Sequence, residues 1–449
     1  MLEHENDLLR EDIHVAIESN SEDKIDQLLY DCNAAQIADI IESFPSQSRE
    51  IIWSHINFDL SGAVLLEIGE EARLNHINTL EESTLAAIIE TLSDVDDQAD
   101  LILDLPAEKL ARTLTILDKS KLVRLESVLA YEDDTAGGLM DLDHITIRAD
   151  VSLDVVLRYL RIRGELPAHT DQLFVTNRHD HYLGVLLIND LLTKNVDDLV
   201  ADIMKEDVQA INANTEDNSV ARKFEDDNII SAPVIDNEGT LIGRITIDDV
   251  VDVIRDEGEH TIMSSAGLSE EDDLFAPIIP SARRRAIWLG INLFTAFLAA
   301  WVIGFFEATL DQIVALAILI TIVPSMGGIA GSQTLTIVIR ALALNQLGSS
   351  NYKHLINKEL AVSFLNGLVW AFIVATSTFL WFEDYKIGII IGLALVINLL
   401  FGALAGATIP VVMKRMNIDP ALAGGVVLTT ITDVVGILAF LGLATLWLI

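Results

Sequence analysis

Residues 421–449 read ALAGGVVLTTITDVVGILAFLGLATLWLI, a run long enough to cross a bilayer as a single helix. Asp433 is the only ionisable residue in this run. A carboxylate inside a membrane is costly unless it faces a water-filled path or a cation. The alternative is a structural carboxylate that is bonded to a neighbouring helix. We favour the first interpretation, which predicts that Asp433 lies on the path of a cation.

Four further apolar runs lie upstream, and each reaches the ~20 residues that a spanning helix needs. They cover residues 286–306, 313–342, 361–382 and 387–413. Five spans place the two ends of the chain on opposite sides of the membrane. One side then receives most of the flanking basic residues, which are Arg283, Arg284, Arg285, Arg340, Lys353, Lys358, Lys414 and Arg415. Because basic residues favour the cytosolic side, the pattern predicts a multi-pass membrane protein with a cytoplasmic amino-terminal half.

The two halves of the chain differ in charge. Residues 1–273 contain 61 acidic and 20 basic residues, a net charge of −41, whereas residues 274–449 contain 7 and 9, a net charge of +2. An acidic soluble half argues against nucleic acid and anionic lipid headgroups as its partners. It favours divalent cations, because close carboxylates repel one another until a cation bridges them. The single cysteine, Cys32, excludes an intrachain disulfide and a cysteine-rich metal site.

The second and fifth runs carry polar faces of the kind that lines a pore. In the second, Pro324 is followed by SMGGIAGSQTLTIVIRALA, where small or polar residues recur every four positions on one helical face. Irregular backbone at proline and glycine is tolerated in a membrane only where it is buried in protein or lines a wet cavity. The pore candidates of the two runs are Gly328, Ser332, Gln333, Thr336, Thr429 and Asp433. In the fourth run, Asn398, Gly402 and Gly406 form a small-residue face that predicts close helix packing.

An internal repeat lies in the acidic half. Residues 173–192, LFVTNRHDHYLGVLLINDLL, align without a gap with residues 232–251, APVIDNEGTLIGRITIDDVV, at an offset of 59 residues. Each copy predicts a strand, a polar turn, a second strand that begins at a glycine (Gly184 or Gly243) and an acidic helix start. This repeat resembles a pair of CBS domains.

The second copy also matches a nucleotide-binding pattern. In CBS pairs that bind nucleotides, a Thr/Ser-x-x-Asp holds the ribose, and Thr246 and Asp249 match it. The first copy has Leu187 in place of the hydroxyl. The resemblance therefore leaves the binding of ATP open.

These patterns predict a multi-domain fold. Residues 1–135 form short amphipathic helices whose weak repeat suggests an acidic helical superhelix. Residues 136–254 hold the α/β tandem CBS pair, and residues 255–280 an acidic connecting helix and linker. Residues 281–449 form an all-α transmembrane domain of five helices. A helix in the connecting position can carry movement of the soluble half to the membrane.

The whole chain resembles an MgtE-type magnesium channel. The family pattern in the second run is close to Gly-Gly-Asn-x-Gly-Asn-Gln with an arginine seven residues later, and residues 327–333 with Arg340 follow it. The Asp-Pro-Ala at residues 419–421 is also family-like. Both pattern asparagines are replaced, by Ile329 and Ser332, which leaves the preferred divalent ion open.

The resemblance implies a homodimer in the lipid bilayer of the bacterial inner membrane, with a pore near its two-fold axis. It implies Mg²⁺ both as the ion that enters down its gradient and as the regulator that closes the pore from the cytosol. No nucleotide hydrolysis is needed, and we expect no enzymatic activity. The expected metal ligands are Asp433 in the pore and Asp94, Asp217, Asp226, Asp249, Asp252 and Glu257 in the cytosolic half.

Two alternatives stay open. The first is a transporter for cobalt or another divalent cation. The second is a membrane-anchored CBS sensor that binds a nucleotide or a metal and transports nothing. The polar second run and Asp433 argue against the sensor, because a membrane anchor needs neither.

Overall fold

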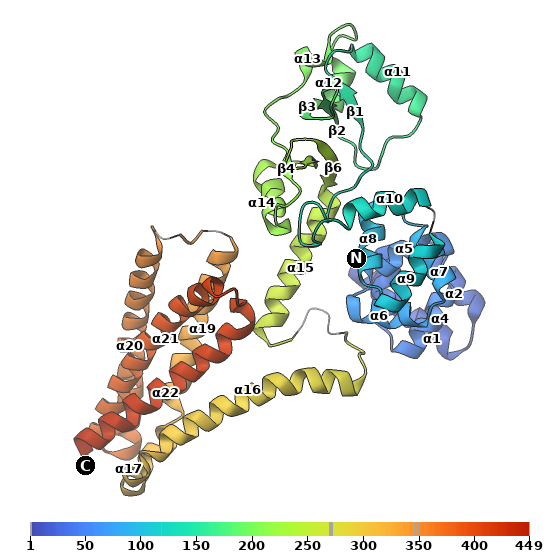
Figure 1. The fold of residues 1–449 in the computed structure, drawn as a ribbon. Helices are drawn as coiled ribbons and strands as arrows, with labels where there is room; N and C mark the ends of the chain where they lie inside the picture. The colour runs from blue at the N-terminus through green and yellow to red at the C-terminus, as the bar shows by residue number, and fades with distance from the viewer. Residues whose placement is uncertain (1, 118, 269–272, 345, 349, 449) are drawn as a thin grey trace. The chain divides into compact units, whose positions relative to one another are not determined.

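The computed structural model describes residues 2–117, 119–268, 273–344, 346–348 and 350–448. The chain divides into two compact units, one of Met1–Gly258 with Glu271–Ala276 and one of Glu259–Glu270 with Pro277–Ile449. Figure 1 shows the sequence of parts along the chain, from short helices through small sheets to long helices. The first unit holds almost all of the acidic half, and the second holds the apolar runs.

The amino-terminal domain consists of short helices, as its amphipathic pattern predicts. Asn33 begins α3 with a capping box, in which its side chain accepts the Gln36 N–H and the Gln36 side chain accepts the Asn33 N–H. Ile37, Ile40 and Ile41 of this helix are buried in an apolar core. The helices are α1 (Leu2–Glu18), α2 (Glu22–Leu29), α3 (Ala34–Glu42), α4 (Ser46–Ser54), η1 (Phe58–Leu60), α5 (Ser61–Glu67), α6 (Glu70–Thr79), α7 (Glu82–Ile89), α8 (Val95–Leu103), α9 (Ala107–Ile116) and α10 (Lys119–Val128).

Two small sheets follow, one for each copy of the repeat. In the first, β1 (Thr146–Arg148) pairs parallel with β2 (Gln172–Thr176), which pairs antiparallel with β3 (Tyr182–Leu187). The second repeats this order with β4 (Ile211–Asn212), β5 (Ser231–Ile235) and β6 (Leu241–Thr246). The helices of this part are α11 (Leu153–Arg163), α12 (Ile188–Thr193), α13 (Val200–Ile203) and α14 (Asp217–Asp227). The predicted α/β pair is therefore confirmed.

The two copies contact each other through equivalent residues. Tyr182 N–H donates to the Gly239 carbonyl at 3.1 Å, and Leu241 N–H donates to the Asp180 carbonyl at 3.0 Å. Tyr182 corresponds to Leu241 in the repeat, and Asp180 corresponds to Gly239. The reciprocal bonds show that a local pseudo-two-fold axis relates the copies.

The glycines expected to begin the second strand of each copy lie inside it. β3 begins at Tyr182 and β6 at Leu241, ahead of Gly184 and Gly243. A Cβ at Gly184 would lie 2.4 Å from the Lys205 carbonyl oxygen. Glycine is required there because another segment crosses closely over the strand, and the glycine does not mark the strand's start.

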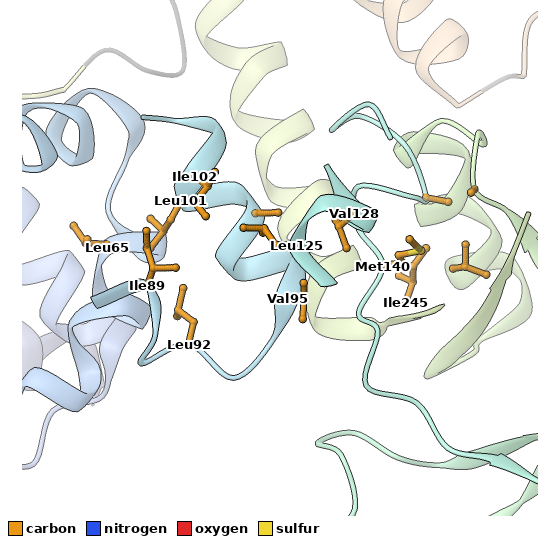
Figure 2. Close-up of a cluster of buried hydrophobic side chains, with 14 of the residues drawn as sticks. Leu65, Ile89, Leu92, Val95, Leu101, Ile102, Leu125, Val128, Met140 and Ile245 are labelled. Carbon is orange, nitrogen blue, oxygen red and sulfur yellow. The ribbon is translucent and has the colours of Figure 1, made fainter. Parts of the chain in front are cut away.

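One apolar cluster joins the helical domain to the second sheet (Figure 2). It runs from the short helices through α8 and α10 to β6. Because the core is shared, movement of the helical domain away from the second sheet would expose apolar surface to water. Labelled members are Leu65, Ile89, Leu92, Val95, Leu101, Ile102, Leu125, Val128, Met140 and Ile245.

The connecting helix α15 (Ile247–Ser265) follows β6 directly. Asp249 caps it, because its Oδ2 accepts the Thr246 N–H at 3.0 Å and the Thr246 hydroxyl at 3.1 Å. The connecting helix expected within residues 255–280, together with a linker, begins at Ile247 and ends at Ser265.

The second unit contains five helical spans that are long and apolar enough to cross a membrane. Of these, α21 is the most buried within the described structure, whereas α16 and α20 expose most of their surface. The helices are α16 (Ile278–Gly304), α17 (Glu307–Gln312), α18 (Val314–Leu319), α19 (Ile322–Ala343), α20 (Tyr352–Phe382), α21 (Tyr385–Arg415) and α22 (Pro420–Leu448).

The second span is broken into two helices. α18 ends at Leu319 and α19 begins at Ile322, ahead of Pro324. Pro324 lies in the first turn of α19, where its missing N–H removes no helical hydrogen bond. The two residues between the helices, Ile320 and Thr321, keep helical backbone angles, so the break interrupts the hydrogen bonding within a single span.

Candidate ion pathway and acidic cluster

A pocket of about 490 Å³ lies between α19 and α22. All six pore candidates of the sequence line it, together with Pro324, Ser325 and Ile329. The polar face of α19 and the polar face of α22 thus meet in one place, although they lie about a hundred residues apart in the chain. The passage of ions through this pocket remains a prediction.

Asp433 is the carboxylate of this pocket. It is half-buried, and within the described structure its side chain makes no hydrogen bond or ion pair. Within the described residues no neighbouring helix binds the Asp433 carboxylate, and its role on a cation path stays a prediction. An unpaired carboxylate on a polar wall can accept hydrogen bonds from the water shell of a cation.

The other polar groups of the pocket are the Gln333 amide, hydroxyls and backbone groups. The Thr336 hydroxyl donates to the Ser332 carbonyl at 3.0 Å, and the Thr429 hydroxyl donates to the Gly425 carbonyl at 2.9 Å. Each hydroxyl oxygen keeps its lone pairs for a hydrated ion. Ile329 is 56% exposed on the same wall, so one of the two positions that differ from the family pattern faces the pocket with an apolar side chain.

α19 and α22 pack closely behind the pocket. A Cβ at Gly331 would lie 2.8 Å from Leu428, and a Cβ at Gly436 would lie 3.2 Å from the Pro324 nitrogen. Gly328 has more space around it, because a Cβ added there would lie 3.7 Å from Thr432 Oγ1. The glycines therefore set the spacing of the two pocket walls.

Glu359 is a carboxylate of the membrane unit that the sequence argument missed. It lies on α20, is 5% exposed, and accepts the Thr334 hydroxyl of α19 at 3.1 Å. Lys358 approaches its other oxygen at 3.1 Å. The expected third run began at residue 361, which left Glu359 outside the span. The sequence signal that could have identified Glu359 was the charged pair Lys358 and Glu359 just before an apolar run.

In the first unit, acidic side chains gather where the helical domain meets the second sheet. Burial raises the pKa of Asp97 to about 7, and that of Asp249 to about 7, with a further rise from neighbouring carboxylates. Burial also raises the pKa of Asp96 well above its usual range. The cluster, called the acidic cluster below, comprises Asp94, Asp96, Asp97, Asp141, Asp248, Asp249 and Asp252.

Arg244 is a basic residue at the edge of this cluster. Its guanidinium pairs with the Asp141 carboxylate at 3.1 Å, and both side chains are buried. Asp141 precedes the first sheet and Arg244 lies on β6, so only the fold brings them together. Arg255 is a second basic residue beside the cluster and pairs with Asp252 at 3.1 Å. The two ion pairs leave the remaining carboxylates of the cluster in excess, and protons or cations would relieve their repulsion.

The other predicted metal ligands lie apart from this cluster. Asp217 and Glu257 are close enough for the Glu257 charge to raise the pKa of Asp217, although burial is the larger cause. Asp226 is exposed on α14. In the described part of the chain, no three His, Cys, Asp or Glu side chains converge closely enough to hold a metal ion as they stand. The ligand assignments stay predictions.

The nucleotide pattern has a structural explanation within this fold. Both polar groups of Thr246 bind Asp249, and the Thr246 hydroxyl also contacts the Asp248 carboxylate. The Thr-x-x-Asp thus serves as the cap of α15. Binding of ATP stays a prediction, since it would have to replace these bonds.

Five apolar spans joined to intracellular helical and CBS domains define a multi-pass membrane transporter with an intracellular amino-terminal domain. The family models that match are "Divalent cation transporter" over residues 320–443, "MgtE intracellular N domain" over residues 32–134 and "CBS domain" over residues 200–256.

Known relatives place the chain more closely. It is 31% identical to "Magnesium transporter MgtE" of Thermus thermophilus, over 79% of this chain and 80% of the relative. It is 26% identical to the protein of the same name in Bacillus subtilis, over 91% of this chain and 90% of the relative. A solved "cytosolic domain of the Mg2+ channel MgtE in complex with ATP" is 26% identical and covers 54% of this chain and 99% of its own, with a TM-score of 0.49. The chain belongs to the MgtE family of magnesium transporters, which are not enzymes.

Proposed function

We propose that the chain is a passive Mg²⁺ channel whose ion path runs through the pocket at Asp433. The observation that carries this proposal is an unpaired carboxylate on a polar wall inside otherwise apolar helices. Uptake of Mg²⁺ into proteoliposomes that contain the purified chain, with and without internal Mg²⁺, tests it. A channel of this kind takes up Mg²⁺ without ATP, and internal Mg²⁺ reduces the rate.

The size of the pocket supports passage of a hydrated ion. Mg²⁺ prefers six oxygen ligands and gives up water reluctantly. Six waters occupy about 180 Å³ at their share of liquid volume. The pocket offers about 490 Å³, so its volume can hold Mg²⁺ together with its six inner waters. Selection then depends on hydrogen bonds from those waters to oxygens of the wall.

The membrane potential supplies enough driving force. Moving one elementary charge across 100 mV is worth about 2.3 kcal/mol, so a divalent cation gains roughly 4.6 kcal/mol on entry. No hydrolysis step is required.

Two copies of the chain would complete the ion path. The pocket is open on one side, and its wall carries the exposed Ile329. A symmetric homodimer would place a second Asp433 opposite the first, because a two-fold axis presents the same surface of both subunits. A pair of carboxylates suits a divalent cation better than one.

The acidic cluster is the proposed sensor of cytosolic Mg²⁺. Two carboxylates ~6 Å apart repel by roughly 2.8 kcal/mol at an effective dielectric constant of ~20. Two such pairs, when a cation neutralises them, approach the ~5.5 kcal/mol that inverts a two-state equilibrium. Mg²⁺ would therefore hold the helical domain against the second CBS copy, and α15 would transmit this to the membrane.

Compaction by Mg²⁺ predicts slower proteolysis. Full-length protein in detergent micelles should be cleaved in its first half more slowly at millimolar Mg²⁺ than in chelator, because the bound cation stabilises the contact between the helical domain and the second sheet. Gel electrophoresis of a timed digest measures this. Equal digestion in the two conditions would count against a sensor in this half.

Stability in chelator should fall as the pH rises. Asp97 and Asp249 have a pKa of about 7 in the folded chain, which is above the value of about 4 expected when unfolded. A raised pKa in the fold means that the stability contributed by these two groups is greatest below pH ~4 and declines up to pH ~7. Thermal unfolding of the full chain at pH 6 and pH 8 checks this. Burial also raises the pKa of Asp96 and Asp100, which shift stability in the same direction. Millimolar Mg²⁺ should restore stability at pH 8, because it binds the ionised carboxylates. A flat profile in chelator would contradict this.

The two positions that differ from the family pattern predict a change in selectivity. Ile329→Asn with Ser332→Asn would add two amide oxygens to the α19 wall of the pocket, so the ratio of Mg²⁺ to Ca²⁺ or Co²⁺ uptake should rise several-fold. Uptake of each ion into proteoliposomes gives the ratio. Val338→Ala, a buried change on α19 outside the pocket, is the matched control for altered packing. An unchanged ratio in a folded double variant would remove α19 from the selectivity argument.

A further inference from the structure

Three residues of α21 lie against backbone carbonyls on three consecutive turns of α19. A Cβ at Gly402 would lie 2.6 Å from the Gly327 oxygen, and one at Gly406 would lie 2.4 Å from the Gly331 oxygen. One turn earlier, the Asn398 side-chain amide donates to the Val323 carbonyl at 2.8 Å. The backbones touch at the two glycines, whereas a side chain separates them at Asn398. α19 and α21 therefore diverge toward the first turn of α19.

Asn398 also reaches α22. It is fully buried, and its amide occupies a socket between Gly327 of α19 and Gly436 of α22. A Cβ added to Gly327 would lie 2.1 Å from the Asn398 amide nitrogen, and a Cβ added to Gly436 would lie 2.8 Å from the same nitrogen. One side chain thus contacts both helices that form the walls of the pocket.

The socket contacts the first turn of α19. Val323 lies in the first turn of α19, just after the break that separates it from α18. Pro324 and Ser325, the next two residues, line the pocket. On the other wall, Gly436 follows Asp433 by one turn of α22. A bond to Val323 therefore fixes the pocket wall opposite the carboxylate.

Simple packing does not explain an amide at this position. The Asn398 Oδ1 is buried and has no hydrogen-bond partner within the described structure. Rotating the amide by half a turn would place this oxygen against the Val323 carbonyl, which would be repulsive. A buried unpaired acceptor costs stability that an apolar side chain of similar volume would not.

We infer that Asn398 is a positioning residue of the ion pathway, which sets the spacing of Pro324 and Ser325 from Asp433 without touching the ion. This inference rests on the proposed ion path. Loss of the amide donor should let the first turn of α19 move and change how well the wall matches the water shell of Mg²⁺.

Two substitutions test the inference. Asn398→Leu keeps the branched shape of the side chain and removes the donor, but it is larger. Asn398→Ser is too short to reach Val323 and, being smaller, does not strain the socket. In proteoliposomes each substitution should raise the half-saturating Mg²⁺ concentration by about tenfold, while the maximal rate changes little. A tenfold change corresponds to the free energy of about one buried hydrogen bond. The ratio of Mg²⁺ to Ca²⁺ uptake should fall. A merely structural residue would lower the yield of folded protein and leave both quantities unchanged.

The matched control is Thr309→Val. It removes another buried interhelical bond, from Thr309 to Thr445 at 2.8 Å, which lies outside the pocket. It should lower thermal stability and leave half-saturation and the ion ratio as in the parent chain. The inference is overturned if the Asn398 variants behave in the same way. Asp433→Asn, measured beside them, separates the two claims: normal uptake in that variant refutes the ion path itself.

Discussion

Mg²⁺ uptake should fall by about 100- to 1000-fold when Asp433 is replaced by Asn. A carboxylate and a divalent cation 4 to 5 Å apart attract by roughly 7 to 8 kcal/mol at an effective dielectric constant of ~20. Loss of about half of this attraction corresponds to two to three orders of magnitude in affinity. Asparagine keeps the size of the side chain and removes its charge. Uptake into proteoliposomes measures the loss, and size-exclusion chromatography shows that the assembly is retained.

A matched control separates this effect from a general loss of negative charge. Asp311 is an exposed carboxylate of α17 in the same unit, and it lies outside the pocket. Asp311→Asn should leave uptake close to that of the parent chain. Near-normal Mg²⁺ flux through folded Asp433→Asn would refute the proposed path.

Regulation by internal Mg²⁺ should disappear when the acidic cluster is neutralised. In Asp96→Asn with Asp97→Asn and Asp249→Asn, three carboxylates lose the charge that opposes close contact of the helical domain with the second sheet. The cytosolic half should then be compact without Mg²⁺, so uptake should be low and should change less than twofold between zero and millimolar internal Mg²⁺. Flux at both concentrations, with protease resistance in chelator, measures the effect.

The control for this variant changes the same number of charges elsewhere. Asp197→Asn, Asp202→Asn and Glu206→Gln remove three exposed carboxylates of the first CBS copy. Regulation should persist in that variant. High, unregulated uptake in the cluster variant would show that bridging by the cation, and not loss of repulsion, closes the channel. Full regulation in the cluster variant would exclude the cluster as the sensor.

Much of the fold could be predicted because its signals are local. A run of apolar residues predicts a span whatever its neighbours are, since the bilayer demands it. The repeat predicts two α/β copies because each copy carries its own strand and turn pattern. Asp433 stands out for the same reason, as one charge among apolar neighbours. The sequence by itself thus determined the class of fold, the family and the residue at the centre of the proposed path.

The tertiary structure decided what depends on register between distant segments. Asn398 and its glycine neighbours predicted only close packing, and the socket between Gly327 and Gly436 appears only when three helices meet. Asp141 joins the acidic cluster through a pairing with Arg244 across the second sheet. Glu359 is buried because it finds Thr334 on another helix. Side chains far apart in the chain acquire their partners and their pKa values from packing, which no local pattern encodes.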